Sequence, residues 1–168
     1  LSGNRLNDES VSSLFGSFRE LQPSHLTCVD LSMNNISVIG LQALTQSLEV
    51  RNSLFSGPTH SFPLFQHIGN LTALNLSNNP LRENCADCLG YLVSHLPALI
   101  TLNLASTRVT DHGVSAIVDA WLGRCPIVDS EASSCNVSLT SLNVSGNELT
   151  DASLLVLNDL LNHNAVCP

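Results

Sequence analysis

One phrase of eleven residues recurs along the chain and limits what the chain can fold into. The phrase has the form L-x-x-L-x-L-x-x-N-x-L; complete copies begin at Leu26, Leu71, Leu99 and Leu139, and a truncated copy begins at Leu1. Its apolar positions alternate as in a short strand with one buried face. Because one such strand cannot bury its apolar face alone, the copies are expected to stack on one another.

A helical pattern follows each strand. Nine positions after the last apolar residue of the strand every copy has a small residue: Ser10, Gly40, Cys85, Gly113 and Ser153. Thirteen positions after it every copy has a large apolar residue: Leu14, Leu44, Leu89, Ile117 and Leu157. Apolar residues at this spacing form one face of a helix. Four helix starts carry an N-cap candidate: Asn7, Ser37, Thr110 and Thr150. Each unit is therefore predicted to be a strand, a turn and a helix.

These residues, in phrases such as LTALNLSNNPL and LTSLNVSGNELTDAS, resemble the ribonuclease-inhibitor-like leucine-rich repeat family over nearly the whole chain. The resemblance implies an α/β solenoid: a right-handed superhelix of about five repeats, with a parallel sheet on its concave side and helices on its convex side. It does not imply one activity, because members of the family bind many unrelated partners.

The amide at the asparagine position of the phrase is expected to bind backbone groups of the neighbouring turn. The position holds Asn4, Asn34, Asn79 and Asn147 in four copies, and Thr107 in the other. A threonine side chain is shorter and has one donor, so we expect fewer hydrogen bonds at Thr107. The asparagines are predicted to be structural, not catalytic.

The spacing of the copies predicts one domain with two insertions. Successive copies are 30, 45, 28 and 40 residues apart, so extra sequence lies near residues 51–70 and 124–138. Both insertions come after a helix and before a strand, which predicts that they emerge at one edge. The chain starts part-way through a strand, so we expect residues 1–168 to form a single domain within a longer chain.

Two surfaces are candidates for binding a partner. The first is the concave sheet face, where polar residues line up: Asp30, Asn75, Asn103 and Asn143, with Ser32, Ser77 and Ser145 beside them. Tryptophan, tyrosine and arginine, which dominate binding hot spots, are absent from these strands, so a merely solvated face is the alternative. The second is the first insertion, where Phe55, Phe62 and Phe65 either anchor a partner or cover the edge of the solenoid.

The cysteines do not indicate a metal or redox site. Cys85 and Cys88 form a C-x-x-C pair, but they occupy positions at which the other copies have mostly small residues, which predicts core packing. Cys125 and Cys135 flank the second insertion and would be bonded only in an exported protein; we expect thiols. The histidines are scattered, and only His60 and His67 share a segment.

Charge and motifs exclude several function classes. The chain has fourteen acidic residues against six arginines and no lysine, and its net charge of -8 argues against a nucleic-acid partner. No apolar run of about 18 residues is present that could insert into a membrane. No phosphate-binding loop or nucleophile motif is present, so we expect neither an enzyme nor a cofactor nor a bound metal.

The sequence therefore predicts a protein-protein interaction module, acting as a scaffold or assembly component in the cytoplasm and offering a rigid surface to another protein within a larger assembly. Two alternatives remain open. Related repeats activate a nuclear-transport GTPase, and Arg5, Arg82 and Arg108 follow strands where such a surface would carry charge. The second alternative is an exported receptor-like ectodomain, which would show a Cys125–Cys135 bond and sugars on sites such as Asn75.

Overall fold

Four short parallel strands form one sheet in the computed structural model, which describes residues 1–17, 26–49, 70–123 and 138–164. The strands are β1 (Cys28–Asp30), β2 (Ala73–Asn75), β3 (Thr101–Asn103) and β4 (Ser141–Asn143), and they lie in chain order. Leu74 pairs with Val29 on one side and with Leu102 on the other. This order is the one that a stack of similar units produces, because each unit contacts only its neighbours.

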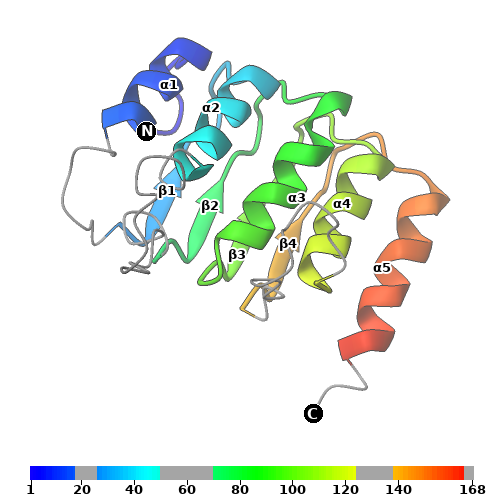
Figure 1. Ribbon diagram of the computed structural model, residues 1–168. Coiled ribbons are helices and arrows are strands. Elements are labelled where there is room, and N and C mark those ends of the chain that lie inside the picture. Colours follow the sequence, from blue (N-terminus) through cyan, green and yellow to red (C-terminus); the bar gives the residue numbers. More distant parts are fainter. Residues whose placement is uncertain (18–25, 50–69, 124–137, 165–168) are drawn as a thin grey trace, which may run out of the picture.

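The helices form a second row in the same order, beside the sheet (Figure 1). They are α1 (Asp8–Ser17), α2 (Val38–Glu49), α3 (Ala86–His95), α4 (Asp111–Trp121) and α5 (Asp151–Asn164), and a short 3-10 helix, η1 (Glu83–Cys85), precedes α3. The predicted α/β architecture is confirmed. The truncated first copy contributes α1 and one isolated bridge between Asn7 and Asn35. Most of the two insertions, including Phe55, Phe62, Phe65, Cys125 and Cys135, lies outside the described residues.

The core between the two rows is aliphatic and is closed in the inner units. Leu74 and Leu102, the central residues of β2 and β3, are 1% and 0% exposed. Leu142, the corresponding residue of β4, is only partly buried, although the repeat pattern gives it the same position as Leu74 and Leu102. The physical reason is that β4 has a neighbour on one side only in the described part of the chain.

An asparagine ladder connects consecutive turns, as predicted. Asn79 is 1% exposed. Its Nδ2 donates to the carbonyls of Leu31 in the preceding turn and Leu76 in its own turn, both at 2.9 Å, and its Oδ1 accepts the N–H of Ile36 at 3.1 Å. Thr107 donates its one hydroxyl proton to the carbonyl of Leu104 at 2.7 Å, which confirms the expectation of fewer bonds at this position.

Acidic side chains at helix starts cap the next helix in the stack. Asp8 at the start of α1 accepts the N–H groups of Ser37 (2.7 Å) and Gly40 (3.0 Å) and the Ser37 hydroxyl (2.6 Å) at the start of α2. Asp111 at the start of α4 accepts the N–H (2.9 Å) and hydroxyl (2.6 Å) of Thr150, and the hydroxyl of Ser153, at the start of α5. These bonds satisfy helix N–H groups that have no partner within their own helix.

The predicted N-cap residues make side-chain cap bonds at three of four positions. Asn7 accepts the N–H of Ser10 at 3.0 Å, and the hydroxyls of Ser37 and Thr150 each accept an N–H two residues on at 3.2 Å. Thr110 is the N-cap residue of α4, as predicted, but its side chain makes no cap bond. The start of α3 has no side-chain cap either. In the unit before α3, the position that Asp8 and Asp111 hold in their own units is occupied by Val38, which has no carboxylate.

The hydrogen bonds of Asp111 predict a loss of stability in acid. The Ser153 and Thr150 hydroxyls and the Thr150 N–H lower the pKa of Asp111 to about 2, against about 3.9 in an unfolded chain. The contribution is present above the unfolded pKa and is lost as the pH falls from about 4 to about 2. We expect the urea midpoint of wild type to fall more across this window than that of Asp111→Asn. Parallel curves would contradict this expectation.

Gly40 is required by the cap that Asp8 forms. A Cβ built on Gly40 would lie 2.6 Å from Asp8 Oδ1 and 2.7 Å from Ile36 Cγ2. We expect Gly40→Ala to destabilise the protein by about 1 to 3 kcal/mol in urea unfolding, despite the better helix propensity of alanine. Gly16→Ala in α1 is the matched control, because nothing lies within 4 Å of its Cβ position. A stabilised Gly40→Ala variant would show that the space is available.

Candidate functional site

The outward side chains of β1 to β4 form the sheet face, and a row of acid and amide groups crosses its centre. The strand register aligns Asp30 with Asn75, Asn75 with Asn103, and Asn103 with Asn143. Asp30 and Asn143 are exposed, and the two residues between them are half-buried. The sequence pattern thus placed this row correctly, and the structure brings its four members together.

In each member of this row, one side-chain oxygen accepts a hydrogen bond from the backbone of the turn that follows its own strand. Oδ1 of Asp30 accepts the N–H of Ser32 (2.9 Å), and Oδ1 of Asn75, Asn103 and Asn143 accepts the N–H two residues on at 3.0–3.1 Å. The oxygen is therefore occupied within the protein. The amide nitrogens of Asn103 and Asn143 have no acceptor among the described residues and remain available as donors.

Asp30 places a fixed negative charge at one end of the row. The Ser32 hydroxyl donates to its Oδ1 at 2.6 Å. This hydrogen bond, followed by that of the Ser32 N–H and helped by the Asn75 side chain, lowers the pKa of Asp30 below its usual range. The carboxyl group is therefore ionised at neutral pH, and the row presents one anion followed by amides.

Two predicted members of the sheet face are not on the surface. Ser32 and Ser77 are 5% and 7% exposed, so the prediction that they point outward is wrong. They follow the strands, where the chain is already turning inward, and the Ser32 hydroxyl lies 2.8 Å from that of Ser2. Ser145, in the last unit, is exposed as predicted.

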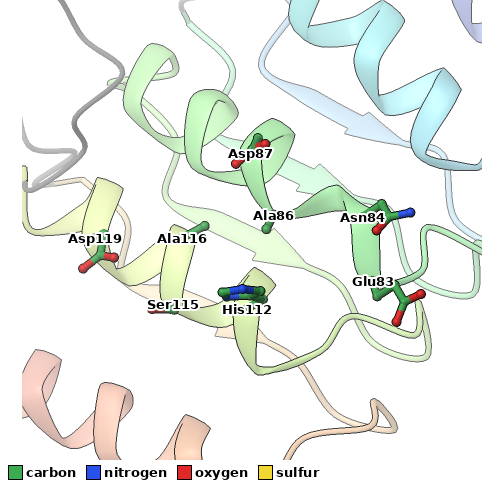
Figure 2. A pocket seen from close by; sticks show the side chains of 8 residues that line it. All are labelled: Glu83, Asn84, Ala86, Asp87, His112, Ser115, Ala116 and Asp119. Atoms are coloured by element: carbon green, nitrogen blue, oxygen red, sulfur yellow. The ribbon is translucent and has the colours of Figure 1, made fainter.

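An acidic groove of about 500 Å³ lies on the helical side, where η1 and α3 meet α4 (Figure 2). Its lining residues are mostly polar: Glu83, Asn84, Ala86, Asp87, His112, Ser115, Ala116 and Asp119. Sequence reasoning missed it. The available signal was the presence of two acidic residues, Glu83 and Asp87, close to the predicted start of the third helix. Among the described residues no group of three or more potential ligands is placed to hold a metal ion.

Comparison with known families decides the assignment. One leucine-rich repeat model matches residues 22–44, 95–118 and 135–157, and a second one matches residues 70–92. The chain belongs to the leucine-rich repeat family. It is also 34% identical over 104 residues to a Tonsoku-like protein of Bos taurus and 31% identical over 104 residues to one of Danio rerio. These relatives are much longer, since the match covers 62% of this chain but 6% of either relative.

The cysteine pair belongs to the packed interior of the leucine-rich repeats, as predicted. Cys85 and Cys88 are free thiols with exposures of 0% and 8%. Cys85 donates its S–H to the carbonyl of Arg82 at 2.9 Å. Burial raises the pKa of Cys85 to about 11, so the group stays protonated at neutral pH and is a poor nucleophile.

Two of the three arginines of the activator hypothesis, Arg82 and Arg108, lie in the turns after β2 and β3, and Arg5 lies in the equivalent segment of the truncated first copy, before α1. Arg5, Arg82 and Arg108 are exposed and have left-handed backbones, with φ of 50°, 66° and 62°. Arg82 and Arg108 lie in adjacent turns, since the N–H of Arg82 donates to the carbonyl of Thr107 at 3.1 Å. Acidic residues lie close to these arginines in the stack: Glu83 directly follows Arg82, and Glu148 lies in the turn after β4, the unit that follows that of Arg108. No helix of the described part is long and apolar enough to span a membrane.

Proposed function

We propose that the chain is a scaffold or assembly module that binds another protein on the sheet face, with Asp30, Asn75, Asn103, Asn143 and Ser145 as contact residues. The observation that supports this most is the row of amides whose oxygens are fixed by their own turns. A partner meets donors that are already positioned, so little conformational entropy is lost on binding.

The chemistry of the row suggests what the partner offers. Asn103 and Asn143 have free amide donors, so a partner segment with carbonyl or carboxylate oxygens fits that end. Asp30 is an anion at the other end and favours a basic or N–H donor group. The sheet face would thus bind an extended segment in one chain direction and not in the reverse direction.

The test is partner recovery with the full-length protein, followed by binding measurements with the purified partner. Asn103→Asp combined with Asn143→Asp keeps the oxygens that accept the N–H groups of Ala105 and Ser145, but removes the outward donors. We expect at least a tenfold loss of affinity, which is about 1.4 kcal/mol in binding free energy. Because the two new carboxylates lie side by side on paired strands, thermal unfolding is measured as well, to show that the variant is folded at the temperature of the binding assay.

The acidic groove provides the matched control surface. Asp87→Asn combined with Asp119→Asn also exchanges two side chains between carboxylate and carboxamide, but these side chains line the groove on the helical side. The affinity of this variant should equal that of wild type. Unchanged binding by the sheet-face variant, with loss of binding by the groove variant, would assign the partner to the groove instead.

The cytoplasm is the compartment we propose for this module. The free thiols of Cys28, Cys85 and Cys88 are compatible with a reducing environment. Titration of native protein with a thiol reagent, before and after denaturation, would test it. A Cys125–Cys135 bond in protein isolated from its natural source would favour the exported alternative.

A further inference from the structure

The second position after the last apolar residue of each strand has a left-handed backbone in all five units. Its φ is 72° at Gly3, 55° at Met33, Asn78 and Ser106, and 65° at Gly146. In the first four units the N–H at this position donates to a carbonyl of the next turn at 2.8–2.9 Å. The stacking of the turns therefore imposes this conformation on whichever residue occupies the position.

Met33 is the residue least suited to this conformation. Glycine has no Cβ and asparagine has a short polar side chain, so both enter the left-handed region more readily than other residues. Methionine has a long apolar side chain, and that of Met33 is 62% exposed, so packing within the described part of the protein does not compensate the strain. Residues held in unfavourable backbone conformations concentrate at functional sites. Met33 is therefore a candidate for contact with a partner.

The surface beside Met33 offers open space and a carboxylate. The N–H of Gly3 donates to the carbonyl of Ser32 at 2.9 Å, which places Gly3 beside Met33 in the stack, and a Cβ built on Gly3 would have nothing within 4 Å. Ser32 directly precedes Met33, and its N–H (2.9 Å) and hydroxyl (2.6 Å) both donate to Oδ1 of Asp30. An exposed thioether thus lies next to the one carboxylate of the sheet-face row.

We infer that Met33 and Asp30 together bind a lysine or arginine side chain of the partner protein, with the apolar stem of that side chain against Met33 and its cationic group at Asp30. The inference rests on the proposed binding of a partner to the sheet face. Lysine and arginine place their aliphatic stems along apolar surface while the charged end stays accessible. The net charge of -8 favours the approach of a basic segment. Met33 then determines specificity and is not needed by the fold.

The probe is a phage-displayed library of random linear peptides, selected on the wild-type protein. We expect the selected peptides to share a lysine or arginine. Synthetic copies in which that residue is replaced by norleucine keep an apolar stem but lose the charge, and they should bind about three- to tenfold more weakly in fluorescence polarisation. Recovery of no peptide, or of peptides without a shared basic residue, would overturn the proposal.

Met33→Asn gives this position the residue type that the next unit has at Asn78. We expect the variant to bind the selected peptides about five- to tenfold more weakly, because the apolar contact is lost. Its Tm should be unchanged or higher by up to about 3 °C, because asparagine relieves the backbone strain. Met33→Leu keeps an apolar side chain and should keep most of the affinity. A lower Tm of Met33→Asn would show that Met33 serves the fold, and would contradict the proposal.

Asn78→Ser is the matched control, because it gives the same position of the next unit the residue type found at Ser106; its affinity and Tm should equal those of wild type.

The variant that combines Asn103→Asp with Asn143→Asp separates this site from the rest of the sheet face. Loss of the peptides by that variant, with full binding by Met33→Asn, would refute the role of Met33 and leave the sheet face as the binding surface. Loss by Met33→Asn alone would support the site at Met33 and Asp30. Wild-type binding by both variants would refute both proposals.

Discussion

Leu102→Ala should destabilise the protein by about 2 to 5 kcal/mol, the usual cost of truncating a closed aliphatic core. Leu102 is the central residue of β3, is 0% exposed, and has strands on both sides. Removing its side chain leaves a cavity in a layer that cannot collapse, because β2 and β4 fix the strand on either side.

Leu142→Ala is the matched comparison, because Leu142 pairs directly with Leu102 and occupies the same position of the next unit. Its partial exposure predicts a smaller loss, about 1 to 2 kcal/mol. Urea unfolding followed by circular dichroism measures both. Equal losses would show that the β4 layer is as closed as the β3 layer, contrary to the structure.

Asn79→Ala should cost about 2 to 4 kcal/mol, because it leaves buried backbone groups without their asparagine partner: the N–H of Ile36 and the carbonyls of Leu31 and Leu76. Asn79→Thr should lose less. A threonine there can keep the bond to the Leu76 carbonyl in the way that Thr107 binds that of Leu104. Urea unfolding of the two variants gives the order directly.

Asn4→Ala serves as the control for this prediction. Asn4 lies in the same position of the first turn, but it is exposed, and its Nδ2 bonds go to the nearby carbonyls of Leu1 and Ser2. Water can replace those bonds, so the expected loss is below about 1 kcal/mol. If Asn4→Ala and Asn79→Ala cost the same, the burial of the ladder would not be the source of its strength.

The sheet-face row shows which residues the alternation of side chains along a strand can place correctly. Alternation along a strand is a local property, so Asp30, Asn75, Asn103 and Asn143 could be aligned from the sequence before any contact was known. The same rule failed at Ser32 and Ser77, two residues past the end of the strands, because alternation stops where the backbone turns inward. The acidic groove was missed because its residues come from two neighbouring units, and no single copy of the phrase contains them.

The sequence by itself determined the register of the stack: which residues are strand, which are helix, and which small positions, including Cys85 and Cys88, must be buried. Those properties repeat within one unit and so are visible in one unit. Only the tertiary structure decided that Asp8 and Asp111 cap the following helix, and that the layer around Leu142 is open. Both depend on contacts between residues about one repeat apart, and the direction in which a side chain reaches its neighbour is not set by the spacing of apolar residues.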